Sequence, residues 1–309
     1  MTAARVVLVL SENWTIVSAR DLPGLVDIAV EAEAAGVDTV MLSEHVVLGA
    51  SSAAHRLMSN PRDYAAPGNQ DPATPWPDSM LLAAAIAART ERIRIALAAI
   101  IAPLRHPLLL AKQLATLDLL CRGRLIVQPT VSWDEQEYAA LGVPFRRRGA
   151  ILDEQLAAMG AAWSQTPASF AGRAFRFSDV YLEPKPFRPE GPRMWFGGMR
   201  LHPPLLRRLV RYGSGFHPFG SPTGEELAEL RRAMAEAGRD IAELEMIGGI
   251  RGTFSDGGGV ADLDQALEAV PAQLAQGYTA ICFKPNQYTD ERAEVGALCR
   301  RVVAAVQGA

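Results

Sequence analysis

The sequence predicts a (β/α)8 barrel, a TIM barrel, that forms a single domain over residues 1–309. Eight short apolar runs alternate with longer amphipathic runs, and this alternation indicates a parallel sheet covered by helices on its outer face. Eight such units in 309 residues suit a closed barrel. An open doubly wound sheet is the alternative, but residues 11–20, after the first run, lack the glycine-rich turn of dinucleotide-binding folds.

The strands are expected where apolar and β-branched residues follow one another between turn residues. The first run, RVVLVL, is of this kind, and it ends at Ser11. Near-continuous apolar runs of this length are typical of strands buried on both faces. We predict strands at residues 5–10, 37–42, 93–98, 125–128, 194–196, 215–217, 244–250 and 279–283.

The helices are expected where amphipathic runs begin near a proline or an acidic residue and end at glycine. Pro23 and Pro107 mark two such starts, and Gly36 and Gly123 two such ends. We predict helices at residues 21–35, 78–89, 107–120, 134–140, 150–163, 204–212, 225–237, 263–275 and 291–306. Residues 43–77 form a long loop, which we expect to be functional or mobile, and residues 171–177 a small hairpin with Gly172 at its turn.

The composition excludes several classes of protein. Thirty-one Lys and Arg residues against 34 Asp and Glu give a net charge of −3, which does not favour nucleic-acid binding. The three cysteines are scattered and form no CxxC pair, so we expect a reducing compartment and no metal site. The longest apolar stretch, about nine residues, is shorter than the ~18 of a membrane span. We therefore expect a cytoplasmic protein.

In a barrel of this type the active site lies at the C-terminal ends of the strands. Among the strand-end segments, residues 11–14, 98–103, 128–133, 197–200, 217–219 and 284–286 are therefore candidates for the site. Ser43-Glu44-His45 offers a histidine and a carboxylate for acid–base chemistry, although a helix cap or a loop ion pair is an equal alternative.

Glycines and aromatic residues at other strand ends carry weaker signals. Gly197-Gly198 would let backbone amides approach a phosphate or a flat ring, but an ordinary tight turn is the more frequent meaning. Trp14, Trp76 and Trp133 are candidates for the wall of an aromatic substrate pocket, and His217 also falls at a strand end. The arginine run at residues 146–148 is expected to be solvated. Because GxSxG, Walker and HExxH motifs are absent, serine acyl transfer and zinc proteolysis are not expected.

Several linked segments resemble one known family. The stretch DSMLLAAAIAARTERIRIALAAIIAPLRHPLLLAKQLATLDLLCRGRL, from Asp78, is similar to the luciferase-like monooxygenase superfamily, and in particular to its actinobacterial branch of coenzyme F420-dependent oxidoreductases. VEAEAAGVDTVMLSEH, SWDEQEYAALGVPFRRRGAILDEQL, FAGRAFRFSDVYLEPKP, and WFGG followed by YGSGFHPFG match in the same order. The resemblance covers residues 20–220 and implies a bacterial-luciferase-like barrel with an insertion around residues 165–190, often as a homodimer.

The resemblance also implies a site. A flavin or deazaflavin is expected across the strand C-termini, with Glu44 and His45 facing the substrate or the cofactor ring. Alignment on Pro103 implies a non-proline cis peptide at Ala99-Ile100, behind the ring. The cofactor-binding residues implied by the match are Ala99, Ile100, Ser132, Gly197, Gly198, Met199 and Arg200.

One segment departs from the family pattern. Relatives carry a GxGxGW ending on the fourth strand, whereas this chain reads IVQPTVSW at residues 126–133 and keeps only the tryptophan and the later Glu137. Ala98-Ala99 likewise replaces a Gly-Thr pair. Side chains in place of hydrogen would reshape the pocket for an unusual substrate or weaken cofactor binding.

Three hypotheses about function follow. The leading one is F420-dependent hydride transfer to or from a small organic substrate, with His45 as acid or base and Glu44 as its orienting partner. The second is an FMNH2-dependent monooxygenase that uses O2 and a partner flavin reductase. The third is a cofactor-free or non-redox relative, suggested by the altered fourth strand. The loop at residues 43–77 is expected to shape the substrate pocket.

Overall fold

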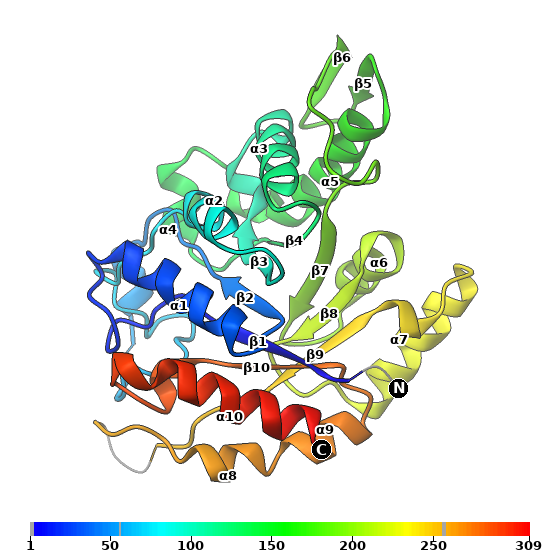
Figure 1. The fold of residues 1–309 in the computed structure, drawn as a ribbon. Helices are drawn as coiled ribbons and strands as arrows, with labels where there is room; N and C mark the ends of the chain where they lie inside the picture. The colour runs from blue at the N-terminus through cyan, green and yellow to red at the C-terminus, as the bar shows by residue number, and fades with distance from the viewer. Residues whose placement is uncertain (1–2, 56, 255–257) are drawn as a thin grey trace.

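The computed structural model describes residues 3–55, 57–254 and 258–309 and contains a closed barrel of eight parallel strands. The strand order around the barrel is β1-β10-β9-β8-β7-β4-β3-β2, so sequential barrel strands are neighbours (Figure 1). This confirms the TIM-barrel prediction. The strands are β1 (Arg5–Val9), β2 (Thr39–Leu42), β3 (Arg94–Ile101), β4 (Leu125–Thr130), β7 (Arg193–Gly198), β8 (Gly215–Pro218), β9 (Glu245–Gly249) and β10 (Ala280–Phe283).

Helices connect the strands and cover the outside of the barrel. Asp78 begins one of them, because its carboxylate accepts the N–H groups of Met80 and Leu81. The helices are α1 (Leu22–Ala34), α2 (Ser79–Arg89), α3 (Pro107–Leu120), α4 (Glu135–Ala140), α5 (Arg148–Ser164), α6 (Pro203–Tyr212), α7 (Gly224–Glu236), α8 (Leu263–Leu267), α9 (Val270–Ala275) and α10 (Val295–Gln307). Within the described part of the chain, none of these helices is both long and apolar enough to cross a bilayer.

Two predicted helices are corrected by the structure. The helix expected at residues 263–275 is broken into α8 and α9. Pro271 explains the break, because it has no N–H to donate and its ring would clash with the carbonyl of Leu267. The last helix begins at Val295 rather than at residue 291, after a single 3-10 turn at Arg292–Glu294.

The insertion lies outside the barrel as an antiparallel hairpin of β5 (Ala168–Ala171) and β6 (Arg176–Val180). It projects from the end of α5, away from the strands (Figure 1). Glu154 of α5 fixes the turn, because its carboxylate accepts the N–H groups of residues 173–175 at 2.6–3.0 Å.

Alternate residues of the strands fill the barrel interior. Those from β3 are Ala96 and Ala98, two small side chains. The pairing of β3 with β4 skips Ala99, and the peptide bond Ala98-Ala99 is cis. The cis bond therefore lies one residue before the predicted Ala99-Ile100 position, because Ala99 is the extra residue of the bulge. The interior residues are Val7, Val9, Met41, Ala96, Ala98, Ile126, Trp195, Ile247 and Ala280.

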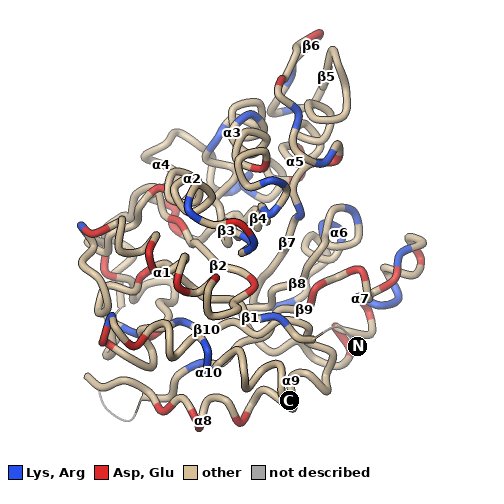
Figure 2. Tube along the Cα trace, in the orientation of Figure 1, with Lys and Arg blue, Asp and Glu red and all other residues tan. Residues whose placement is uncertain are grey.

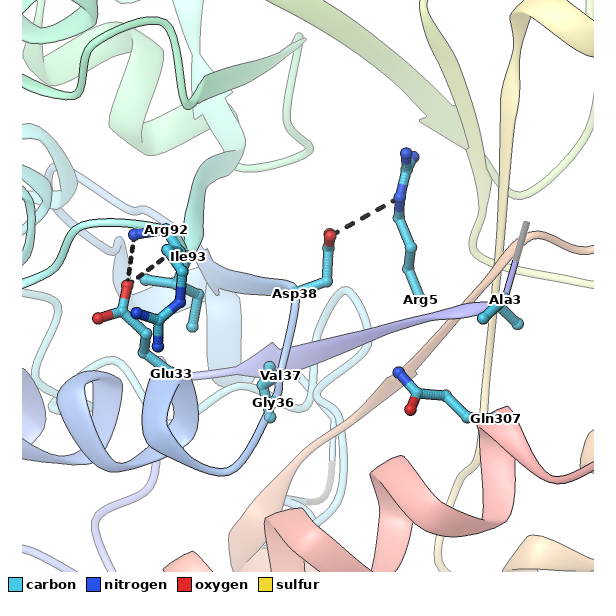
Figure 3. A pocket seen from close by; sticks show the side chains of 10 residues that line it. Ala3, Arg5, Glu33, Gly36, Val37, Asp38, Arg92, Ile93 and Gln307 are labelled. Atoms are coloured by element: carbon cyan, nitrogen blue, oxygen red, sulfur yellow. Dashed lines mark hydrogen bonds and ion pairs between the residues drawn. The ribbon is translucent and has the colours of Figure 1, made fainter.

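The N-terminal end of the barrel is closed by charged side chains. The Glu245 carboxylate lies 2.8 Å from Arg5, 2.7 Å from Arg94 and 3.4 Å from Arg193, and so joins four strands. A cavity of about 390 Å³ opens nearby, between the start of β1 and the loops before β2 and β3. Figure 3 shows Arg5 and Asp38 facing each other on one side of it and Glu33 turned back to the backbone of Arg92 on the other. This end of a barrel stabilises the fold, whereas the site is expected at the other end.

Candidate active site

His45 follows β2 at the C-terminal end of the barrel, and a buried carboxylate holds its ring. Nδ1 lies 3.1 Å from Oε2 of Glu137, whose other oxygen accepts the N–H of Val46 at 2.6 Å. Glu137 is fully buried in the first turn of α4. An imidazole with a carboxylate on Nδ1 presents Nε2 outward, and no described residue is hydrogen-bonded to that nitrogen. The pair has the geometry of a general acid–base group.

Glu44 does not orient His45, contrary to the hypothesis from the sequence. Its carboxylate pairs with Arg105 through two bonds of 2.8 and 2.7 Å and accepts the N–H of Ile101 at 2.8 Å. Ser79 at the start of α2 donates a further bond to it. Successive side chains of an extended segment point to opposite sides, so Glu44 faces the core between β2 and β3 when His45 faces the mouth. Glu44 therefore ties strand ends together.

Two of the three predicted tryptophans meet His45. The rings of Trp76 and Trp133 stand edge-on to the imidazole, at centroid distances of 5.2 and 5.6 Å. Trp76 comes from the end of the long loop and Trp133 from the loop after β4. Trp14, in the loop after β1, is half-buried, and its indole N–H finds no partner among the described residues. An apolar wall around one imidazole excludes water from it.

His217 ends β8 inside the barrel and lies in a different environment. Its Nδ1 is 3.0 Å from Oε1 of Gln128, and its ring contacts Trp195 and Phe219 edge-on. Burial lowers the pKa of His217 to about 4, because a charged imidazole loses its hydration there. His217 is therefore neutral at pH 7. Gln128 is one of the side chains that replace glycine on the fourth strand. In the structure it is the hydrogen-bond partner of His217.

The predicted cofactor-binding residues differ in how exposed they are and in what surrounds them. A Cβ on Gly197 would stand 2.1 Å from the carbonyl oxygen of His217, so close strand packing already requires glycine there. Met199 and Arg200 are exposed just beyond, next to Gly198. Ala99 is half-buried, whereas Ile100 is fully buried in the core between barrel and helices. Ser132 is half-buried with a left-handed backbone, φ +53°.

Ion pairs hold part of the long loop over the barrel mouth. Arg62 pairs with Asp290, and Asp63 accepts two bonds from Arg251. Tyr64 follows and packs against the interior residues of the barrel. Sequence reasoning did not single out Tyr64, because no local pattern marks a loop residue that reaches the mouth. Glu12 lies in the candidate segment 11–14, but no pattern assigned it a role of its own. Glu137 was noted only as a remnant of the fourth-strand motif.

Buried polar atoms without partners gather at this end. Among the described residues, those in the loops after β1, β2 and β10 are Trp14 Nε1, Thr15 Oγ1, Trp76 Nε1, Lys284 Nζ, Asn286 Oδ1 and Tyr288 Oη. Such atoms are costly unless a bound group completes them. The described residues contain no cluster of three His, Cys, Asp or Glu side chains that could hold a metal ion.

These residues fit a flat, polar-edged ring such as a flavin or deazaflavin. Ala98 and Ala99 have small side chains at the end of β3, and the unpartnered indole N–H groups of Trp14 and Trp76 could donate hydrogen bonds to ring oxygens and nitrogens. Exposed Arg200 beside Gly198 could pair with a phosphate tail.

A family model of luciferase-like monooxygenases matches residues 5–294. The chain belongs to the luciferase-like monooxygenase family. The match spans every barrel strand, so this luciferase-like chain has the family's fold throughout. The prediction of the family is therefore confirmed.

Individual relatives match over shorter stretches. An uncharacterised protein of Mycobacterium tuberculosis is 41% identical over 109 residues, 35% of this chain and 38% of that protein. An FMNH2-dependent dimethylsulfone monooxygenase of Pseudomonas putida is 35% identical over 124 residues, 39% of this chain and 34% of that enzyme. The luciferase-like chain thus matches well under half the length of these relatives.

Solved structures extend the likeness of fold over the whole chain. An F420-dependent secondary alcohol dehydrogenase, bound to an F420-acetone adduct, superposes with a TM-score of 0.72 over 99% of both chains at 15% identity. At that identity the comparison concerns the fold alone.

Proposed function

We propose that this chain is a luciferase-like oxidoreductase that transfers hydride between coenzyme F420 and a small organic substrate. The observation that carries the proposal is the His45–Glu137 pair, which turns Nε2 of the imidazole to the mouth between two tryptophans. The resemblance of the segment from Asp78 to F420-dependent oxidoreductases supports this choice of cofactor.

In this proposal each residue of the site has its own role. A bound deazaflavin supplies the two-electron chemistry. His45 holds a proton at Nε2 for the substrate oxygen, or removes one from it, while Glu137 fixes the ring and its tautomer. Trp76 and Trp133 exclude water around that nitrogen. Ala99 leaves room for a ring, and Gly198 and Arg200 are the proposed contacts of its phosphate tail.

An FMNH2-dependent monooxygenase is the second candidate. The identity with the dimethylsulfone monooxygenase favours it, because that relative uses the flavin. This function would require O2 and a partner flavin reductase to supply the reduced cofactor. The same histidine and the same mouth would serve it.

Titration of the purified apoprotein with F420 and FMN, oxidised and reduced, tests the proposal. Quenching of tryptophan fluorescence and calorimetry report binding, since Trp76 and Trp133 line the site. We expect F420 to bind with a Kd of about 1 μM. Preference for FMN would move the assignment to the monooxygenase. Binding of neither cofactor would overturn both and favour a cofactor-free relative.

A further inference from the structure

Lys284, the first residue after β10, is fully buried with its ammonium unpaired. Its exposed fraction is 0%, and no described residue accepts a hydrogen bond from Nζ. Nζ lies over the ring of Tyr64, 5.3 Å from its centroid. A buried charge without a partner is rare in a folded protein, and it is retained where a bound group completes it.

The backbone directs Lys284 to the mouth of the barrel. Ala280 and Cys282 pack against the interior residues, and residue 284 keeps an extended backbone with φ −113° and ψ 114°. Side chains alternate along an extended chain, so Lys284 lies on the same inward side as Ala280 and Cys282, at the C-terminal end. Tyr64 from the long loop packs onto that interior and covers Lys284.

The acidic side chains near Lys284, Asp63 and Glu12, do not form an ion pair with it. Asp63 is already bound to Arg251 at 2.7 and 3.0 Å. Glu12, in the loop after β1, forms no ion pair or side-chain hydrogen bond with the described residues, and it holds a left-handed backbone with φ +59°. The Glu12 carbonyl accepts a bond of 2.9 Å from the Asn286 side chain, so the loop after β1 lies against the segment that follows Lys284.

Burial acts on Glu12 and Lys284 in the same sense, against the charged form of each. It raises the pKa of Glu12, with Lys284 and His45 opposing the rise, and it lowers the pKa of Lys284, with Glu12 and Asp63 opposing the fall. A bound anion that accepted a hydrogen bond from Nζ would stabilise the ammonium form of Lys284. The group that best completes such a site is an oxygen anion.

We propose that Lys284, Glu12 and Tyr64 form a substrate subsite for a carboxylate group. Lys284 donates to the carboxylate, the Glu12 carboxyl bonds to its second oxygen, and the Tyr64 ring packs on the carbon beside it. The term substrate rests on the proposed oxidoreductase function, and it implies that the reaction takes place on a small carboxylic acid.

Lysine-selective NMR tests the subsite without cofactor or turnover. The chain has only three lysines, Lys112, Lys185 and Lys284, so a protein labelled with 13C at lysine Cε gives three lysine signals. Lys112 and Lys185 donate to backbone carbonyls of the insertion and its surroundings, and they serve as internal controls. Lys112→Arg and Lys185→Arg assign the signals and leave Lys284 in place.

The probes are acetate, butyrate and benzoate, each with its neutral amide of the same shape. We expect at least one carboxylate to shift the Lys284 signal saturably, with its amide at least about tenfold weaker, and the other two lysines unmoved. Lys284→Met should abolish the saturable binding followed by calorimetry, whereas Lys185→Met should retain it.

Three results would overturn the subsite. They are no saturable shift of Lys284 up to about 50 mM of any carboxylate, equal shifts with the amides, and equal shifts of all three lysines. Because these titrations use apoprotein, they are independent of the cofactor titrations. A failed subsite would leave the proposed function standing, and a failed cofactor titration would leave carboxylate binding to be judged on its own.

Discussion

His45 and His217 occupy the same end of the barrel but differ in what surrounds the ring. A carboxylate holds Nδ1 of His45, and its ring is about a tenth exposed. An amide oxygen faces Nδ1 of His217, and aromatic rings enclose it. The first environment suits a group that gains and loses a proton, and the second keeps a neutral ring fixed as a hydrogen-bond partner. Of the two histidines, His45 is therefore the one that we propose for acid–base chemistry.

Replacing His45 should remove turnover and leave the fold intact. We expect His45→Asn to lower kcat/KM by about 10²–10⁴-fold, which is the usual contribution of a general acid or base. Glu137→Gln should lower it less, because the ring stays in place and loses only its charged partner. Steady-state kinetics with the cofactor found by titration measure both effects.

The matched control is His55→Asn, an exposed histidine of the same loop. Its turnover should equal that of the unaltered protein. If His45→Asn also kept full turnover with normal cofactor binding, His45 would have no part in the chemistry.

Burial of His217 should make stability fall in acid. Its pKa is about 4 in the folded chain and about 6.5 when unfolded, so below pH 6.5 only the unfolded chain takes up the proton. Its contribution is therefore complete above pH 6.5 and is lost progressively as the pH falls towards 4. Between pH 7 and pH 5 the loss is about 2 kcal/mol. Urea unfolding of the unaltered chain and of His217→Gln measures it, and equal pH dependence in the two would refute it.

At the scale of elements, the close approach of β7 and β8 restricts which side chains fit at the ends of these strands. Gly197 pairs with His217 and Gly198 with Pro218 across these strands. A side chain on Gly197 would meet the backbone of β8 rather than open space, so the glycine is needed whatever binds above it. The ties from Glu44 to Arg105 and to the backbone of Ile101 similarly fix the ends of β2 and β3.

A methyl group at Gly197 should destabilise the barrel. Because its Cβ would lie 2.1 Å from a backbone oxygen, we expect Gly197→Ala to cost about 1–3 kcal/mol of unfolding free energy. Gly160→Ala, within α5 and with no atom within 4 Å of the added methyl, should instead stabilise by about 0.5–1 kcal/mol. Urea denaturation compares the two, and a neutral Gly197→Ala would show that β7 and β8 separate easily.

At the scale of the molecule, charged residues form exposed ion pairs on the surface and one largely buried network at the N-terminal end of the barrel. Basic and acidic residues are interspersed along the chain, as Figure 2 shows, and many of their pairs lie on the surface. Glu245 differs, because its side chain is only 9% exposed and its three arginine partners come from β1, β3 and β7. Such a carboxylate holds separate parts of the barrel together at its N-terminal end.

Removing this charge should destabilise the whole barrel. We expect Glu245→Gln to lower the unfolding free energy by about 1.5–3 kcal/mol, because the mostly buried Arg94 loses one of its two carboxylate partners, whereas Arg5 and Arg193 are partly solvated. Asp264→Asn breaks only the exposed pair with Arg301, and it should change stability by less than about 0.5 kcal/mol. Denaturant unfolding followed by circular dichroism measures both. Equal effects would mean that the buried network contributes no more than a surface pair.

Local patterns predict the elements well and side-chain partners poorly. Apolar runs and turn residues located all eight barrel strands to within a few residues, because burial on both faces leaves a continuous signal. The break at Pro271 was missed although the residue is plain in the sequence, because the amphipathic pattern continues across it. The position of the cis bond, Ala98-Ala99, depends on the register of β3 against β4, which no single segment encodes.

The sequence by itself therefore determined the barrel and the position of His45 at the C-terminal ends of its strands, because periodicity and strand-end position are local properties. Only the tertiary structure decided that Glu137, 92 positions away, holds His45 and that Glu44 faces the core. It also decided that Tyr64 covers Lys284. These contacts join distant segments, and their existence depends on how the closed barrel brings the strand ends together.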